Sequence, residues 1–333
     1  MRKIRIAQIG LNQYSHSLKV LRSLCKQSDI FDFVGYALPE GEKERLPKAA
    51  AEIAAAVPEM TLEQILTDPT IEAVAVETDE IYLTKYAIMA AEHGKHIHME
   101  KPGGRELEDF RKLIEIVQKN GKVFHTGYMY RYNPFIQELL EQAKRGDLGE
   151  ILSVEAQMNC FHPAAMREWL KDLPGGMMFY LGCHLVDLIY QLQGMPEEII
   201  PLNKCSGVSG VTGEDQGFAA FVYPNGVSFA KTSAVELGGF ERRQLVVTGT
   251  KATVELKPLE WHLPGTTAQS TARTVRTNEG WYVPGVTEYS PTLDRYDGMM
   301  ASFAAMVRGE KTNPYTPEYE LALYELVLRA CGL

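Results

Sequence analysis

Short apolar runs alternate with amphipathic helical stretches through residues 4–127, and this alternation restricts the chain to few folds. Strands are predicted at Ile4–Ile9, Phe33–Ala37, Ala73–Glu77, His96–Met99 and Val123–Gly127. Helices are predicted between them at Ser15–Gln27, Glu42–Ala56, Ile81–His93 and Glu106–Asn120, and after Thr61, which has capping-box spacing to Gln64. Each connection has the length of a βαβ crossover. We therefore expect an α/β fold with a doubly wound parallel sheet.

The pattern changes after Gly127, so we expect two domains, residues 1–126 and 127–333. The later elements are predicted as a helix from Pro134 to Gly146, a strand at Ile151–Met158, a helix through His184 to Gln193, strands at Gly217–Tyr223 and Val227–Ser233, and helices at Asp294–Val307 and Glu318–Cys331. The two central strands are joined by residues 224–226, as in a hairpin. The stretch Pro264–Thr277 lacks large apolar residues and is expected to form an exposed loop or an irregular hairpin. The second domain should be α+β with an open, mainly antiparallel sheet.

The charge balance argues against a nucleic-acid or membrane partner. The formal net charge is -9, whereas both surfaces select clustered Lys and Arg. The apolar stretch after Met1 is too short and too charged for a signal peptide, so a cytoplasmic protein is expected. Five scattered cysteines have no metal-ligand spacing, and we expect reduced thiols and no metal.

The turn after the first strand has a degenerate dinucleotide-binding pattern. Gly10, Asn12 and Ser15 occupy the three positions that are usually glycine. Asn tolerates a left-handed backbone and Ser caps helix N-termini, so the loop amides could still hold a phosphate. The second strand ends in Leu38 where a ribose-binding acid is usual, with Glu40 as a possible substitute. Because no basic residue is predicted to receive a 2′-phosphate, NAD is favoured over NADP. A doubly wound domain that binds no dinucleotide is the alternative.

The segment from Gly94 to Pro102 ends a predicted strand in Glu-Lys-Pro. Further motifs follow in order: Arg131-Tyr132-Asn133-Pro134, Gly146-Asp147-Leu148-Gly149, Trp169, Gly175-Gly176, Gly182-Cys183-His184-Leu185-Val186-Asp187 and the run from Gly249 to Val254. This ordered set resembles the glucose–fructose oxidoreductase, inositol dehydrogenase and rhizopine-catabolism family (Gfo/Idh/MocA). The resemblance implies an N-terminal Rossmann domain and a second domain whose open sheet mediates oligomerisation. With the loop, it implies cofactor contacts at Gly10, Leu11, Asn12, Gln13, Thr78, Glu100, Lys101 and Pro102.

The chain departs from this family at two further places. Residues 77–80, Glu-Thr-Asp-Glu, stand where relatives carry Thr-Pro-Asn near the nicotinamide, which leaves only Thr78 as an expected contact. The family's Asp-x-Gly-x-His pattern begins here with Tyr180, so the usual catalytic aspartate is missing.

Lys101, His184 and Tyr180 are the predicted catalytic residues. Oxidation of a carbinol needs a base for the hydroxyl proton and a group that polarises the oxygen. A partly desolvated Lys101 suits the second role, His184 is the natural proton acceptor, and Tyr180 could orient it or donate. Helical spacing places Tyr180, His184 and Asp187 on one face, with Asp187 expected to be structural. A solvated Lys101 and a core His184 packed by Tyr180 are the alternatives.

Tyr128, Arg131 and Trp169 are predicted, with His184, to line a pocket for a hydroxyl-rich ligand, or else to join the domains. The favoured function is an NAD-dependent dehydrogenase that acts on a secondary hydroxyl of a sugar, cyclitol or glycoside. Two alternatives remain: a lyase, glycosidase or isomerase that retains NAD and oxidises its sugar transiently, and a cofactor-free binding or regulatory protein. A homodimer or homotetramer is expected, because an open sheet face tends to be buried against a partner.

Overall fold

The computed structural model describes residues 2–39, 41–46, 50–52, 55–263, 267–277 and 280–333. The chain divides into two compact units. The first contains Met1–Tyr128 and Tyr296–Tyr324, and the second contains Met129–Arg295 and Glu325–Leu333. The first break lies two residues beyond the domain boundary expected at residue 126. The chain returns to the first unit at Tyr296, which the sequence pattern did not predict.

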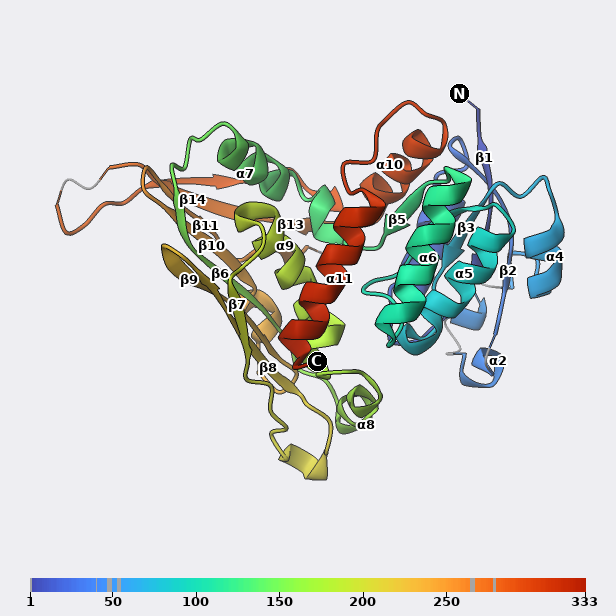
Figure 1. Cartoon of the computed structure of the whole chain (residues 1–333), viewed down its shortest axis with the longest axis horizontal. Coiled ribbons are helices and arrows are strands. Elements are labelled where there is room, and N and C mark those ends of the chain that lie inside the picture. The colour runs from blue at the N-terminus through green and yellow to red at the C-terminus, as the bar shows by residue number, and fades with distance from the viewer. Residues whose placement is uncertain (1, 40, 47–49, 53–54, 264–266, 278–279) are drawn as a thin grey trace. The chain divides into compact units, whose positions relative to one another are not determined.

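A five-stranded parallel sheet forms the core of the first unit (Figure 1). Its strands, in the order β2-β1-β3-β4-β5, are β2 (Phe31–Ala37), β1 (Ile4–Ile9), β3 (Ala73–Val76), β4 (His96–Met99) and β5 (Phe124–Thr126). The side chains of β3 and β5 are all buried, because helices cover both faces of such a sheet. The predicted doubly wound parallel sheet is confirmed.

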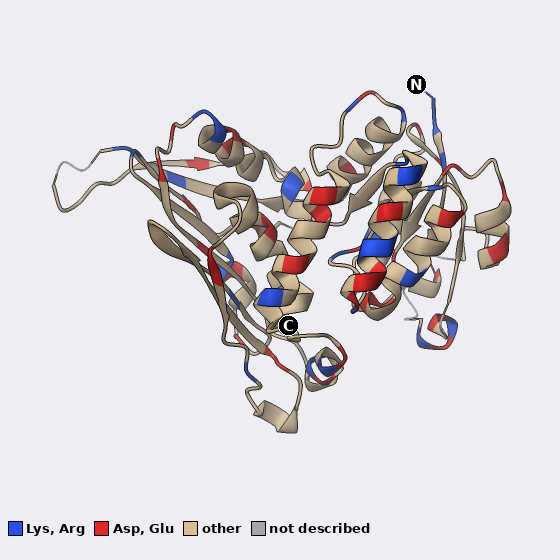
Figure 2. Cartoon of the chain, viewed as in Figure 1, with Lys and Arg blue, Asp and Glu red and all other residues tan. Residues whose placement is uncertain are grey.

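The helices of the first unit follow the predicted order. They are α1 (Ser17–Lys26), α2 (Glu42–Arg45), α4 (Leu62–Thr67), the 3-10 helix η1 (Glu80–Tyr82), α5 (Leu83–Glu92), α6 (Leu107–Asn120), α10 (Asp297–Val307) and the first half of α11 (Pro317–Cys331). The predicted capping box is present, since Thr61 Oγ1 accepts from Gln64 N and Gln64 Oε1 accepts from Thr61 N. Acidic and basic residues are interspersed along α6 (Figure 2), as expected for a solvated helix face.

Two predicted helices are shorter in the structure. The helix expected from Ser15 begins at Ser17, because the Ser15 hydroxyl accepts from the Ser17 amide inside the preceding loop. The helix expected over residues 42–56 is interrupted: α2 ends at Arg45, Leu46 is extended, and residues 50–52 are helical again. A residue before proline disfavours the helical region, and Pro47 follows Leu46 in the sequence. Residues 40, 47–49 and 53–54 lie outside the described residues.

An eight-stranded sheet dominates the second unit, in the order β15-β14-β11-β10-β6-β9-β8-β7. Its strands are β6 (Ile151–Asn159), β7 (Glu198–Pro201), β8 (Gln216–Tyr223), β9 (Gly226–Ser233), β10 (Gln244–Gly249), β11 (Thr253–Leu256), β14 (Thr271–Val275) and β15 (Val286–Tyr289). β6 and β9 pair in parallel, and the other described pairs are antiparallel. The mainly antiparallel sheet is therefore confirmed.

The stretch expected as a loop or irregular hairpin contains two strands. β14 pairs with both β11 and β15 in the large sheet. β13 (Thr267–Gln269) pairs with β12 (Trp261–His262) and β16 (Leu293–Asp294) in a small second sheet. The loop expectation was wrong for residues 267–275, because small polar side chains on partly exposed strands leave no apolar alternation to detect. Residues 264–266 lie outside the described residues.

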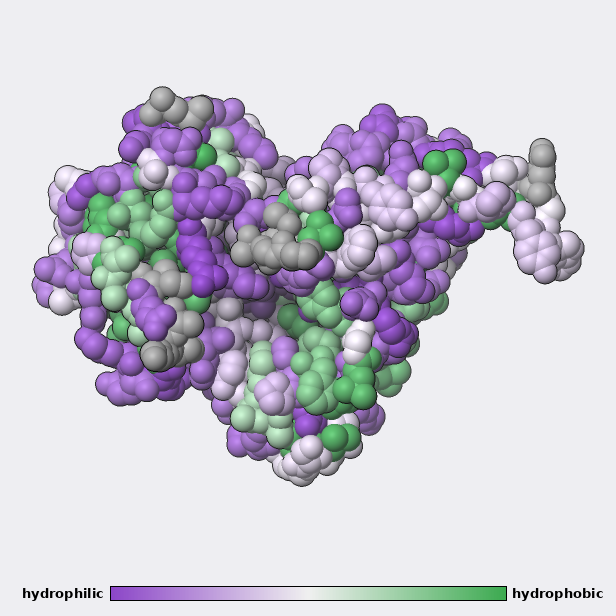
Figure 3. Space-filling model, turned by 180° about the vertical axis from the view of Figure 1, so that it is seen from behind, coloured by the Kyte–Doolittle hydropathy of each residue, from purple (hydrophilic) through white to green (hydrophobic). Residues whose placement is uncertain are grey.

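One face of the large sheet carries helices of the second unit: α9 (Cys183–Gln193) packs on β6 and β9. Along β8 the side chains alternate between buried and half-buried, as in a sheet covered on one face only. On the open face the Phe218 and Phe229 rings stack at 5.5 Å, and Ile200 and Val227 are exposed. Figure 3 shows hydrophobic side chains gathered over this unit. Among the described helices, none has both the length and the apolar composition to cross a membrane.

Candidate active site

The strand order of the first unit creates a switch point between β1 and β3. From β1 the chain runs outward to β2, and it then returns to the other side of β1 to form β3. In open α/β sheets, ligands bind at the carboxyl ends of the strands beside such a reversal. Gly10 ends β1 with a φ of +94°, and a Cβ there would lie 2.5 Å from backbone atoms of Thr78 after β3. Only glycine allows these two loops to approach so closely.

Most amides of the glycine loop already have acceptors within the chain. Leu11 N donates to Glu42 Oε2 at 2.6 Å, Asn12 N to the Glu77 carbonyl at 3.2 Å, and Tyr14 N to Asn12 Oδ1 at 3.1 Å. Ser209 is the only described non-glycine residue with a positive φ. Asn12 therefore replaces glycine without adopting a left-handed backbone, contrary to the expectation, and uses its side chain to hold the loop.

Glu42 occupies the position beside the loop where a ligand's phosphate would be expected. Its carboxyl group accepts from the Leu11 amide and, at 2.6 Å, from Thr78 Oγ1. Burial raises the pKa of Glu42 to about 7, against the lowering effect of these two donors. The adjoining cavity, which Asp79 and Arg45 also line, has a volume of only about 10 Å³, enough for one water molecule.

Arg45 was not anticipated at this cavity. Its guanidinium lies 2.9 Å from Asp79 Oδ2, so a basic group does stand beside the loop, although paired with an acid. Glu40, the predicted substitute for the ribose-binding acid, lies outside the described residues. Thr78, predicted as a cofactor contact, is buried and donates to Glu42.

Two further glutamates are fully buried beyond β3. Glu80 Oε2 accepts from Asn12 Nδ2 at 2.8 Å. Burial raises the pKa of Glu80 to about 8, and burial together with the charges of Glu100 and Glu80 raises the pKa of Glu77 well above its ordinary value. Burial therefore favours the protonated forms of Glu77 and Glu80, since an isolated buried carboxylate is very costly.

Lys101 follows β4 and is completely buried. Its Nζ lies 3.4 Å from Glu100 Oε1, which also lies 3.1 Å from His16 Nδ1. Burial alone would raise the pKa of Glu100, but His16 and Lys101 lower it below the ordinary value. Pro102 follows through a cis peptide bond. The predicted contacts Glu100, Lys101 and Pro102 thus stand at the carboxyl edge of the sheet, with Lys101 next to an ionised carboxylate.

The loop fits a dinucleotide under one condition. A diphosphate binds to free loop N–H groups, and the Leu11 amide becomes available only when Glu42 withdraws. Protonation weakens Glu42 as an acceptor and removes its charge, and a pKa near 7 allows this at neutral pH. Leu11 and Gln13 would then hold the phosphates, and the protonated form of Glu80 would offer an O–H donor to a ribose hydroxyl. Gly10, whose N donates to the Ala37 carbonyl at 2.8 Å, would contribute only the close approach of the backbone.

His184, Tyr180 and Asp187 belong to the second unit and have different partners. His184 lies in the first turn of α9 with its ring edge-to-face against Tyr130, the centroids 5.5 Å apart. Tyr180 packs edge-to-face on Trp169, 5.4 Å between centroids. A π-helical turn, η4 (Met178–Gly182), leads into α9. The α-helical spacing assumed for Tyr180 and His184 therefore does not apply. Such turns often occur at functional sites.

Asp187 binds Arg131 in a buried bidentate pair. Arg131 Nη2 donates to Asp187 Oδ1 at 2.8 Å and Arg131 Nε to Oδ2 at 3.0 Å. Gln191 also donates to Asp187. The predicted pocket residue Arg131 is thus held in place by Asp187 within the second unit. Tyr128, also predicted for the pocket, is buried at the end of the first unit.

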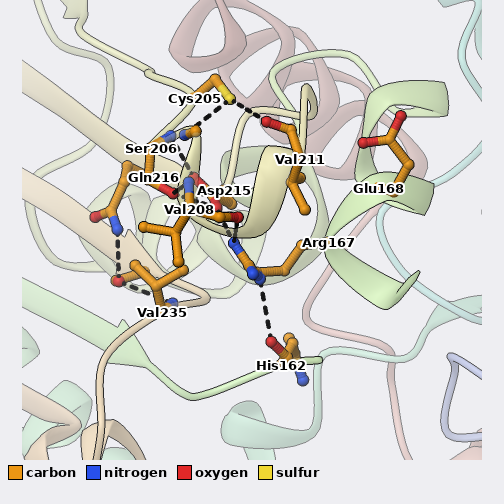
Figure 4. A network of polar contacts seen from close by, with 12 residues as sticks. His162, Arg167, Glu168, Cys205, Ser206, Val208, Val211, Asp215, Gln216 and Val235 are labelled. Carbon is orange, nitrogen blue, oxygen red and sulfur yellow. Dashed lines mark hydrogen bonds and ion pairs between the residues drawn. The ribbon is translucent and has the colours of Figure 1, made fainter. Parts of the chain in front are cut away.

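A second buried ion pair fixes the helix that carries Trp169. Arg167, on α8 (Ala164–Trp169), contacts Asp215 Oδ2 at 2.8 Å and the carbonyls of His162 and Val208 (Figure 4). Ser206 donates to the same carboxylate. The hydrogen bonds of Arg167 thus fix α8 to the residues around it. Because Trp169 lies on the same helix, they also hold its ring against Tyr180.

Sequence reasoning missed several polar residues of both units: His16, Glu42, Glu80, Tyr130, His162, Arg243, Glu260 and Arg295. His162 lies 6.2 Å from Tyr180, ring to ring, and burial lowers its pKa to about 4. The acidic run after Leu38 was a usable signal for Glu42, close to the expected position. The others come from separate loops that only folding brings together.

Comparison with known proteins places both units in one group. A family described as "Oxidoreductase family, NAD-binding Rossmann fold" matches residues 4–128, and one described as "GFO/IDH/MocA C-terminal domain" matches residues 136–255. An uncharacterised oxidoreductase, ORF334, of Rhizobium meliloti is 24% identical over 59% of this chain and 58% of its own length. The scyllo-inositol 2-dehydrogenase (NADP(+)) IolW of Bacillus subtilis is 26% identical over 41% of this chain and 39% of its own. The matched segments thus span about two fifths to three fifths of these relatives.

The fold is shared with a solved structure over its full extent. The UDP-N-acetylglucosamine 3-dehydrogenase GnnA of Acidithiobacillus ferrooxidans has a TM-score of 0.76 with 20% identity, covering 100% of this chain and 97% of that one. At this identity the likeness concerns the fold. The matched family is described as NAD-binding, whereas the name of IolW specifies NADP(+). These comparisons therefore do not distinguish between the two cofactors.

Proposed function

Because the chain belongs to the Gfo/Idh/MocA oxidoreductase family, we propose that it is a dehydrogenase that transfers a hydride between a nicotinamide and a secondary hydroxyl of a sugar, cyclitol or glycoside. The observation that carries this proposal is Lys101, a buried cation at the carboxyl edge of the parallel sheet. A desolvated ammonium there polarises a substrate oxygen strongly, since no water screens it.

His184 and Tyr180 complete the proposed chemistry. Hydride acceptance is what a bound nicotinamide supplies. Lys101 binds the substrate hydroxyl oxygen and stabilises its developing negative charge, and His184 accepts the hydroxyl proton. Tyr180 orients the substrate or donates from its phenol, in place of the absent aspartate, while Trp169 supplies an apolar wall behind it.

NAD is the proposed cofactor in preference to NADP. Glu42 and Asp79 place carboxyl groups beside the loop, where they would repel a 2′-phosphate, and Asp79 pairs with Arg45, the basic residue among the described ones that line this cavity. Calorimetric titration with both nucleotides at a mildly acidic pH, where Glu42 is protonated, tests this preference. Tighter binding of NADP would overturn it.

The Glu42 contact favours one second candidate: a binding or regulatory protein that uses no dinucleotide. Denaturing the purified protein, identifying any released nucleotide and screening polyols and sugars for reduced nicotinamide separates the candidates. Formation of NADH supports the dehydrogenase. Retained NAD without net NADH indicates transient oxidation of the sugar. An absence of nucleotide binding on both sides of the Glu42 pKa supports the second candidate.

We further propose that the open face of the large sheet joins two copies of the chain. Phe218 and Phe229 lie on this face, and solvation of stacked aromatic rings is unfavourable. Light scattering at micromolar concentration should show a dimer or tetramer that Phe229→Glu dissociates. Lys251→Glu, an exposed position outside the open face, is the control. A monomeric wild-type protein would contradict the proposal.

A further inference from the structure

One edge of the eight-stranded sheet is a strand whose side chains are all in solvent. β15 lies at this edge beside β14, and Val286, Thr287, Glu288 and Tyr289 are exposed along its whole length. Among the described strands, none pairs with the other side of β15. Such an edge presents unpaired N–H and C=O groups to any strand that approaches it.

The hydrogen bonds around β14 show which groups face the free edge. Successive residues of an antiparallel strand bond alternately to one side and to the other. Ser290 N donates to the Ser270 carbonyl at 2.9 Å, so Ser290 faces β14. Thr271 bonds to the segment after β11, on its opposite side, so its partner in register, Tyr289, lies in a pair without hydrogen bonds. The N–H and C=O groups of Tyr289 and Thr287 therefore point away from the sheet.

The opposite edge of the sheet is protected against pairing. β7 ends in Pro201, which has no N–H to donate. β15 contains neither proline nor lysine, and its register with β14 has no bulge. Of the two edges, β15 is therefore the one that can accept a further strand.

Two adjacent aromatic side chains lie in solvent just before β15. Trp281 is 99% exposed and Tyr282 is 96% exposed. The residues that follow them are held in place, because Arg273 donates to the carbonyls of Val283 and Pro284 at 2.8 and 2.9 Å. Tryptophan and tyrosine are enriched in protein interfaces, where burial of their rings contributes much of the affinity. Their position next to an open edge indicates a protein partner there.

The sequence of β15 is compatible with a second copy of itself in one register. In an antiparallel pair of two β15 strands, only residues that face the edge can exchange hydrogen bonds. Pairing Thr287 with Tyr289 of the second copy would place the two Glu288 carboxylates opposite each other, which is destabilising. Pairing Thr287 with Thr287 instead places Glu288 opposite Val286. It also brings Tyr289 opposite Gly285, which has no side chain to obstruct the ring.

We propose that β15 pairs antiparallel with β15 of a second copy of this chain, about a two-fold axis between the two Thr287 residues. In an antiparallel pair the segment before one strand runs beside the segment after the other, so Trp281 and Tyr282 lie against the second copy. The axis is perpendicular to the sheet, and the open faces of both copies point to the same side. This contact is therefore separate from the open-face contact proposed above. Together the two contacts, with perpendicular axes, close a tetramer.

Light scattering on the full chain at micromolar concentration tests the contact. Thr287→Pro removes an N–H that points away from β14, so the sheet should stay intact while pairing is blocked. The mass should fall to half, from tetramer to dimer. Thr287→Val, which keeps the N–H, is the matched control and should remain a tetramer. Phe229→Glu should leave a dimer joined through β15, and its combination with Thr287→Pro should give a monomer.

A cross-link tests the register. Cys25 and Cys205 are exposed, so both are first replaced by serine. In that background Thr287→Cys should form a disulfide between copies on oxidation, because the Cα atoms of a hydrogen-bonded pair lie about 5.5 Å apart, within the range of a disulfide. Glu288→Cys should form none, because each Glu288 faces Val286 of the second copy.

Two results would overturn the inference: an unchanged mass for a folded Thr287→Pro variant, or no cross-link between copies of Thr287→Cys. Circular dichroism and the urea midpoint show whether each variant is folded. If Thr287→Pro does not fold, the cysteine variant decides, since it leaves the backbone N–H in place. Neither measurement involves nucleotide or substrate, so the inference stands or fails separately from the proposed dehydrogenase.

Discussion

The two units bury charged groups in opposite ways. In the first, burial raises the pKa values of Glu42, Glu77 and Glu80 beside the glycine loop, which favours their protonated forms. In the second, Arg243 and Arg295 keep their protons near neutral pH, and both contact Glu260, whose pKa they lower to about 2 against the raising effect of burial. A buried acid adjusts by taking up a proton, whereas a buried guanidinium needs an anion. The first site should therefore respond to pH near neutrality, whereas the arginine–glutamate cluster of the second unit should keep its charges there.

The largest effect is expected for the two proposed reactive groups, Lys101 and His184. Lys101→Ala should lower turnover by about 10²- to 10⁴-fold, as should His184→Ala, because each removes a positioned acid–base or electrostatic group. His184→Asn should be similarly poor, since an amide cannot accept the proton. Steady-state kinetics on an identified substrate measures the loss, and calorimetry should show nearly unchanged nucleotide binding for His184→Ala. Full activity of both alanine variants would place the active site elsewhere.

The Tyr180→Phe variant tests whether the Tyr180 phenol takes the catalytic role of the missing aspartate. A loss comparable to that of His184→Ala would make the phenol the working proton donor, and a loss below about tenfold would make it an orienting residue. The π-helical turn that carries Tyr180 and its packing on Trp169 favour the orienting role, so we expect the smaller loss. Comparison of kcat and KM for both variants provides the measurement.

The sequence predicted the positions of the strands better than the contacts between buried charged side chains. Short apolar runs between amphipathic helical stretches located the strands of the first sheet within two residues, because helices bury both faces of that sheet. They did not predict β14, whose small polar residues lack alternation. Lys101 and His184 stood out through short motifs. Glu260 and Arg243 lie in separate segments and meet only in the tertiary structure, so no local pattern could have paired them.

Glu42→Gln should strengthen nucleotide binding at high pH. In the wild-type protein the affinity should fall as pH rises above 7, by up to about tenfold per pH unit, because ionised Glu42 holds the Leu11 amide and repels phosphate. The amide variant has no charge to regain, so its affinity should change less with pH. Glu44→Gln, an exposed change on the same helix, is the control. Parallel pH profiles for wild type and Glu42→Gln would exclude Glu42 as the proton-linked group.

The last expected effect is on stability, and Glu80→Gln measures it. Burial gives Glu80 a folded pKa of about 8 against an ordinary value of 4.5. Below pH 4.5 both states are protonated and the residue costs nothing. Between these pH values the folded state retains a proton that the unfolded state has released, so wild-type stability falls by at most about 1.4 kcal/mol per pH unit through this residue.

The amide introduced by Glu80→Gln would keep an oxygen to accept from Asn12 and would carry no charge at any pH. The free energy of unfolding of Glu80→Gln minus that of wild type should therefore grow between pH 4.5 and pH 8 in urea titrations. Neutral His98 and His162, whose lowered pKa values of about 4 favour folding as pH rises from 4 to 6.5, contribute equally to both proteins and cancel. Glu108→Gln, at a highly exposed position on α6, should show no such growth. If Glu80→Gln also shows none, Glu80 does not take up a proton on folding. The first unit then loses the clearest support for the view that protons neutralise its buried acids.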